Sequence, residues 1–172
     1  MTWRPEDFDD LARDLRRRMG AEFRDEAEEV ERLTDLQRRR KQTLAEVARR
    51  AMHAGDAATL AIGNRTWRGL IDEVGSDYVK VHTGTAVVEA PFHVVRLALE
   101  PTRAGGHNRT PDASTWIARL GELAMAETQL TLVIDGNDLE GRIVLVATDH
   151  LEFEASVYVA IENVRAVVRS VV

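Results

Sequence analysis

Histidine, serine and carboxylate side chains are the groups in this chain that could carry chemistry, and their spacing argues against a catalytic site. No two of the five histidines lie at the spacing of metal ligands, and the chain has no cysteine. None of the four serines lies in a sharp turn that would expose a nucleophile. Gly105-Gly106 lacks the Lys-Thr that completes a phosphate-binding loop. We therefore predict a protein that is not an enzyme and has no metal site and no cofactor.

Basic side chains form two clusters in the first quarter of the chain. They are Arg16, Arg17 and Arg18, and then Arg38, Arg39, Arg40 and Lys41. Such clusters can bind phosphate groups or an anionic membrane surface. Consecutive residues of a helix point in different directions, however, and acidic residues between the clusters can pair with them. We favour a solvated helix face and keep both clusters as candidate binding sites.

These clusters lie in a segment, residues 1–55, that has the pattern of a helical stem. Pro5 followed by acidic residues is typical of a helix start, and apolar residues then recur at steps of three and four up to Ala51. A helix with such a narrow apolar stripe needs a partner stripe. We favour a coiled-coil dimer, and the alternative is a helical hairpin broken near Gly20.

Residues 59–81 and 131–153 are two copies of one segment. Aligned without a gap they share seven of 23 residues, among them Gly69 with Gly141 and Asp77 with Asp149. Each copy follows a predicted helix and alternates apolar with polar residues in short strands separated by turn residues. A five-stranded sheet this short hides its edges best by closing into a small barrel. The repeat therefore predicts two similar modules.

Together these patterns predict an α+β protein with a long N-terminal helical stem and two tandem five-stranded barrels, each preceded by a helix. The segments are a stem at 1–55, a first barrel at 56–101, a linker at 102–111, and a helix with the second barrel at 112–172. The linker is inferred from its glycine, proline and polar composition.

The strands of the first copy carry the pattern Trp67-x-Gly69-x-Ile71-x-x-Val74-Gly75-x-Asp77-Tyr78-Val79-x-Val81, which ends in Pro91-x-x-Val94-Val95. This pattern resembles the Sm-like and SH3-like small β-barrels, and is most similar to a group of uncharacterised actinobacterial proteins. The second copy matches it more loosely. RNA-binding members of the Sm family hold bases in two loops, and the resemblance implies Tyr78, Lys80 and His93 as candidates for base stacking or phosphate contact here.

The charge distribution bears on this choice of function. Residues 112–172 carry four basic and ten acidic groups, a poor surface for a phosphate backbone. We therefore predict a non-enzymatic, oligomeric scaffold or adaptor that presents paired small barrels to protein partners. The alternative is a Sm-like RNA-binding protein that uses the first barrel and the stem arginines.

Partner and location follow from the same composition. The chain has no apolar run of about 18 residues or more, so we expect no membrane span. The N-terminal residues 1–7 lack the basic start and apolar core of a secretory signal. The lack of cysteine fits a reducing compartment. We expect a cytoplasmic homodimer or higher oligomer with an unidentified protein partner.

Overall fold

The computed structural model describes residues 28–102, 104–135, 137–154 and 156–171. The chain divides into two units, Met1–Gln42 and Thr43–Val172, and the described strands all belong to the second. None of the helices described is long and apolar enough to cross a bilayer.

The helical residues of the first unit end at Lys41, and a new helix, α2 (Leu44–Ala54), starts after two non-helical residues. Thr43 caps α2: its hydroxyl accepts the backbone N–H of Glu46 at 3.2 Å, and the Glu46 carboxylate accepts the backbone N–H of Thr43 at 2.8 Å. This reciprocal capping box specifies a fresh helix start. The predicted long N-terminal stem is therefore wrong; Gly20, the predicted hairpin position, lies outside the described residues.

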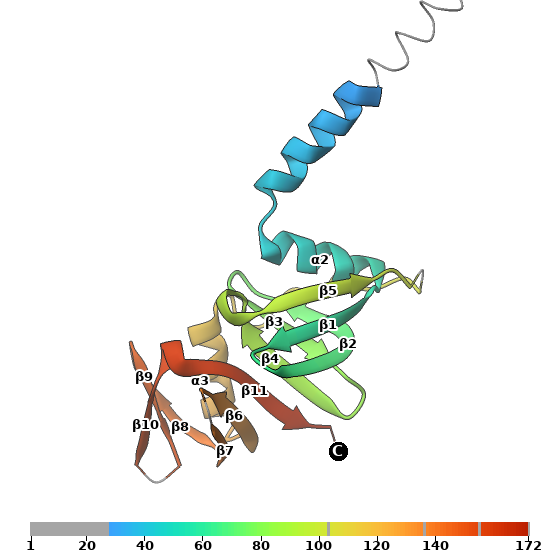
Figure 1. Cartoon of the computed structure of the whole chain (residues 1–172). Coiled ribbons are helices and arrows are strands. Elements are labelled where there is room, and N and C mark those ends of the chain that lie inside the picture. The colour runs from blue at the N-terminus through green and yellow to red at the C-terminus, as the bar shows by residue number, and fades with distance from the viewer. Residues whose placement is uncertain (1–27, 103, 136, 155, 172) are drawn as a thin grey trace, which may run out of the picture. The chain divides into compact units, whose positions relative to one another are not determined.

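The two repeats have the same order of elements (Figure 1). In the first, α2 is followed by β1 (Ala57–Ile62), β2 (Arg65–Val74), β3 (Tyr78–His82), β4 (Ala86–Pro91), the 3-10 turn η1 (Phe92–Val94) and β5 (Arg96–Glu100). In the second, the elements are α3 (Trp116–Met125), β6 (Leu130–Ile134), β7 (Asn137–Gly141), β8 (Ile143–Val146), β9 (His150–Phe153), β10 (Val157–Ala160), η2 (Ile161–Asn163) and β11 (Val164–Ser170). The long strand β2 corresponds to two shorter strands, β7 and β8.

The strands form two antiparallel sheets. Eight strands pair in the order β5-β1-β2-β3-β4-β11-β6-β7, and three pair in the order β10-β9-β8. The repeats are joined by β4 and β11, which place Glu89 opposite Val167 and Val88 opposite Val168. The predicted pair of closed five-stranded barrels is therefore wrong. The eight-stranded sheet is open, because β4 pairs with the last strand of the other repeat and leaves β5 and β7 as sheet edges.

Gly141 divides the long strand of the second repeat. Its φ of 155° lies in the range that favours glycine, and a Cβ there would come within 2.3 Å of the Glu154 side chain. The Glu154 carboxylate accepts the backbone N–H of Arg142 at 2.6 Å. A side chain thus takes a backbone donor that an unbroken strand would offer to its neighbour, and β7 and β8 end up in different sheets.

The core consists of two apolar clusters that exchange residues between the repeats. Tyr78, from β3 of the first repeat, lies in the cluster of the second, where its ring is 6.1 Å from that of Trp116. Val133 and Ala166, from the second repeat, lie in the cluster of the first. Because each repeat completes the core of the other, residues 43–172 form one compact unit.

Candidate functional site

The three residues implied as an RNA-binding loop do not lie together on a surface. Tyr78 is fully buried and Lys80 nearly so, because β3 is a central strand covered on the face that carries both side chains. His93 is exposed in η1 and does not belong to that strand. The structure thus leaves His93 as the one member of the set that a base could reach.

The second basic cluster lies on the helical residues 28–41. Arg38, Arg39, Arg40 and Lys41 are all exposed there, and Arg38 lies 3.6 Å from the carboxylate of Asp35. An exposed pair of this kind contributes little to stability. Arg16, Arg17 and Arg18 lie outside the described residues.

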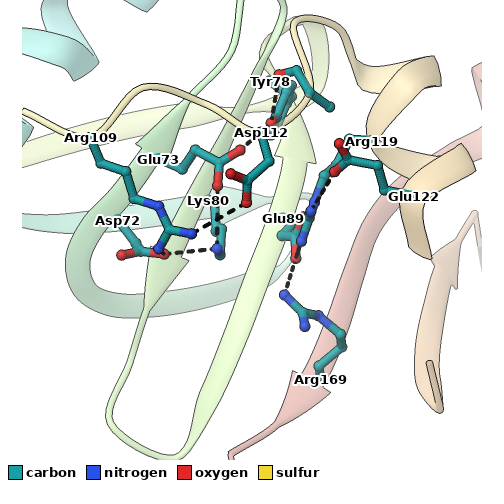
Figure 2. A network of polar contacts seen from close by, with 11 residues as sticks. Asp72, Glu73, Tyr78, Lys80, Glu89, Arg109, Asp112, Arg119, Glu122 and Arg169 are labelled. Atoms are coloured by element: carbon teal, nitrogen blue, oxygen red, sulfur yellow. Dashed lines mark hydrogen bonds and ion pairs between the residues drawn. The ribbon is translucent and has the colours of Figure 1, made fainter. Parts of the chain in front are cut away.

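The chemistry-bearing side chains instead gather between the repeats, in a buried polar network (Figure 2). Its first half surrounds Glu73 in β2, whose carboxylate is fully buried. The Tyr78 hydroxyl donates to this carboxylate and also lies 3.0 Å from the carbonyl oxygen of Ala113, which precedes α3. Lys80 completes the group, with its ammonium 3.3 Å from Glu73 and 2.8 Å from Asp72.

The second half of the network surrounds Glu89 in β4, which is also fully buried. Arg119 of α3 donates two hydrogen bonds to the Glu89 carboxylate. Its Nη2 lies 3.1 Å from Oε1, and its Nε donates to Oε2. Arg169 of β11 donates to the same Oε1. Arg119 also binds Glu122 at 2.7 Å, so each formal charge has an opposite neighbour.

Two hydrogen bonds from the turn before β3 connect the first repeat to the start of α3. The carboxylate of Asp77 accepts the backbone N–H of Trp116 at 2.6 Å, and the backbone N–H of Ser76 donates to the carbonyl oxygen of Ser114 at 2.9 Å. The first N–H groups of a helix have no partner within the helix, and a carboxylate suits that position. Asp77 therefore caps a helix of the other repeat.

The network sets the protonation of its members. Burial raises the pKa of a carboxyl group, but hydrogen bonds and charge from Arg119, and then from Arg169, outweigh it and lower the pKa of Glu89. Burial likewise opposes the effect of Lys80 and Arg109 on Asp72, and its pKa is also lowered. Burial and then the Glu73 carboxylate raise the pKa of Tyr78. At neutral pH the carboxylates of Asp72 and Glu89 are charged and the phenol keeps its proton.

This arrangement links the two repeats through charged groups that pair with one another. Each of its carboxylates accepts from a cation or hydroxyl of the protein, and Glu73 and Glu89 have no contact with solvent. Among the residues described, no cluster of three His, Asp or Glu side chains could hold a metal ion. Removal of one partner from a buried group of this kind is strongly destabilising, because it leaves the remaining charge uncompensated.

A polar groove of about 400 Å³ also lies between the repeats. Its walls carry His93 and Arg65 from the first repeat and Asp135 and Arg165 from the second. Arg165 Nε lies 2.9 Å from Asp135, and Arg65 lies 2.6 Å from Asp138 beside the groove. The pair of Arg65 with Asp138 joins the two repeats, and the pair of Arg165 with Asp135 lies within the second repeat. Each arginine of the groove thus has a carboxylate partner.

The sequence analysis did not identify Glu89 and Arg119, whose ion pair connects the two repeats. A signal was present: Glu89 is the one charged residue in the strand Ala86–Pro91, and such a residue is buried only when paired. Its partners could not be named, because Arg119 and Arg169 lie 30 and 80 residues further along the chain.

Comparison with known proteins adds no family to this description: no protein-family model matches the chain, and no curated protein is similar to it.

Proposed function

We propose that this chain is a non-enzymatic scaffold that assembles through its strand edges and offers those edges to protein partners. The observation that carries the proposal is the β4–β11 pairing, which joins the two repeats edge to edge within one chain. Strand pairing at an edge supplies backbone hydrogen bonds, and side chains on alternate positions supply specificity.

Open strand edges support the same proposal. Among the strands described, β5 and β10 each have a neighbour on one side only. Unprotected edges of this kind are templates for pairing with another chain. Exposed apolar residues lie on β10, which is unusual for an edge that stays in water: Val157 and Tyr158 are 43% and 64% exposed.

The buried network supports a scaffold over an enzyme. Its carboxylates are saturated by protein donors and sit at a joint between two repeats, where they serve to position the repeats. A cytoplasmic location, inferred from the lack of cysteine, stays a prediction. RNA binding is the alternative from the sequence, and two of the three loop residues implied for it, Tyr78 and Lys80, are buried.

The oligomeric state of the full chain tests the proposal. We expect light scattering after size-exclusion chromatography to give masses above the 19.3 kDa of one chain, rising with protein concentration. Nuclease treatment during purification should leave those masses unchanged. A mass of one chain at every concentration contradicts the proposal, and a mass that falls on nuclease treatment favours the RNA alternative.

A further inference from the structure

One face of the first repeat is buried under the second. The face consists of Glu73, Tyr78, Lys80 and Glu89, from β2, β3 and β4. Helix α3 covers it through Trp116 and Arg119, and β11 pairs along its edge. The cover therefore consists of one helix and one strand of the other repeat (Figure 2).

The second repeat has the same face, and the described residues leave it partly exposed there. Strand register identifies the counterparts, because Glu73 lies opposite Lys80 and Lys80 opposite Glu89, as Leu145 lies opposite Glu152 and Glu152 opposite Tyr158. We call Leu145, His150, Glu152 and Tyr158 the β10 face. Leu145 is 55% exposed and Tyr158 is 64% exposed, with its ring 5.9 Å from that of His150. Residues that correspond to a buried interior are thus left in water.

The first repeat carries the two elements that correspond to this cover, namely α2 and the edge strand β5. Helix α2 is the counterpart of α3: each starts after a threonine N-cap, so Leu44 corresponds to Trp116 and Val47 to Arg119. Strand β5 is the counterpart of β11, since Thr59 of β1 lies opposite Ala98 just as Thr131 of β6 lies opposite Val168. Leu44 and Val47 are half-buried, and the outer side of β5 has no strand partner among the residues described.

We propose that the β10 face binds a second copy of this chain, which seats its α2 and β5 there as α3 and β11 sit on the first repeat. This inference rests on the proposed function and names its interface. The register within the chain, Val167 opposite Glu89 and Val168 opposite Val88, translates into antiparallel pairing of β5 with β10. Leu97 of one chain then lies opposite Tyr158 of the next, and Ala98 opposite Val157.

The turn before β9 supplies a second point of attachment. Asp77 caps the start of α3 by accepting the backbone N–H of Trp116. Its counterpart is Asp149, whose side chain is 86% exposed and whose carboxylate lies 2.7 Å from Nδ1 of the neighbouring His150. In the assembly Asp149 accepts the backbone N–H of Leu44 at the start of the incoming α2, a donor that has no partner within its own helix.

The two junctions differ in chemistry, and this difference prevents one pair of elements from binding at the other junction. Within the chain, Glu89 meets Arg119 and Arg169. Between chains, the corresponding positions hold Tyr158 and Val47. If β5 and α2 of another chain took the place of β11 and α3, Glu89 would be buried without a cation, which is strongly unfavourable. The charged junction thus excludes the wrong partner, while the junction between chains, where Leu145 and Tyr158 flank Glu152 and His150, assembles mainly through its apolar side chains.

Two variants of the full chain test the interface from its two sides. Tyr158→Glu places a charge on the β10 face, and Ala98→Glu places one on the opposing edge, where both native side chains are exposed. We expect either variant to have the mass of a single chain in light scattering. Met125→Glu, a matched exchange at an 80% exposed residue near the end of α3, should assemble like the unmodified chain. Thermal unfolding followed by circular dichroism should show that all three variants are folded.

Mixing the two variants gives the decisive measurement. Each keeps one intact side, so β5 of the Tyr158→Glu chain can pair with β10 of the Ala98→Glu chain, and the mixture should give about twice the single-chain mass and no more. Variants that assemble like the unmodified chain, or a mixture that stays at one chain, overturn the proposed interface. The proposed function survives that result, because the unmodified chain still assembles by another surface. The proposed function and the proposed interface are both contradicted only if the unmodified chain is itself monomeric.

Discussion

Glu89 is a single carboxylate shared by three elements: β4, which carries it, and α3 and β11, which supply Arg119 and Arg169. Its burial removes the solvation of a charge, and the two guanidinium groups restore most of it through short, directed hydrogen bonds. The net gain in stability from such a group is small, but removing one member leaves the others uncompensated.

We expect Glu89→Gln to destabilise the folded chain by about 3–5 kcal/mol, because Arg119 then loses the carboxylate that neutralises it in the interior. Urea unfolding followed by circular dichroism measures the change. Asp138→Asn, which disrupts the partly exposed pair with Arg65, should cost at most about 1 kcal/mol. Equal losses of stability from the two substitutions would show that the buried ion pairs of Glu89 stabilise the fold no more than a partly exposed pair does.

Acid should weaken the fold through the same group. The pKa of Glu89 is lower in the folded chain than the value of about 4.3 expected in the unfolded chain, so its contribution is complete above that value and is lost as the pH falls through the lowered pKa. Asp72 acts in the same direction. The free energy of unfolding, measured by urea titration at successive pH values, should decline below about pH 4. The decline should be shallower for Glu89→Gln; a decline of the same slope would assign it to other carboxylates.

At the scale of elements, two glycines provide a matched comparison. A Cβ at Gly69 in β2 would lie 2.1 Å from the carbonyl oxygen of His82 in the paired strand, whereas a Cβ at Gly121 in α3 would meet nothing within 4 Å. We expect Gly69→Ala to destabilise the protein by about 1–3 kcal/mol through this clash. Gly121→Ala should stabilise it by about 0.5–1 kcal/mol, because alanine loses less conformational entropy in a helix. Melting temperatures that move in the same direction for both variants would contradict this account.

Local elements were predictable from the sequence where the pattern was local. The alternation Tyr78–Val81 indicates a strand, and β3 spans Tyr78–His82. The end of the stem was equally local but was overlooked: Thr43 with Glu46 three residues later is the pattern of a capping box, and it marks a new helix where we predicted a continuous one.

Pairing between distant elements was not predictable in the same way. Alternation says that a strand has two faces, but not that β4 will pair with β11 instead of closing on its own repeat. The same gap explains the placement of Tyr78 and Lys80. Their side chains point away from the core of their own repeat, as the alternation in the strand predicts. That face is buried because α3 of the other repeat packs against it.

At the scale of the whole molecule, one duplicated segment produces two junctions of opposite character. The junction inside the chain is built on buried ion pairs, and the one we propose between chains is built mainly on Leu145 and Tyr158. Residues 1–42 form a separate unit, and the assembly described above needs nothing from them.

Salt therefore distinguishes the assembly from nucleic-acid binding. Because the junction at the β10 face buries apolar groups, we expect the mass measured by light scattering to stay constant or rise as sodium chloride increases. Binding to RNA through Arg38–Lys41 would instead weaken steeply with salt, as counterions are no longer released. A mass that drops sharply with salt would argue that charge, and not the apolar face, holds the chains together.

The shared carboxylate also has a consequence for biosynthesis. Arg169 follows Glu89 by 80 residues, so a ribosome finishes β4 long before it makes the strand that lies against it. At roughly 5–20 residues per second, that strand's edge waits for several seconds with its acidic group in water. A charged side chain on a strand edge disfavours pairing with other chains, so we expect Glu89 to protect that edge until Arg119 and Arg169 pair with the same carboxylate in the finished fold.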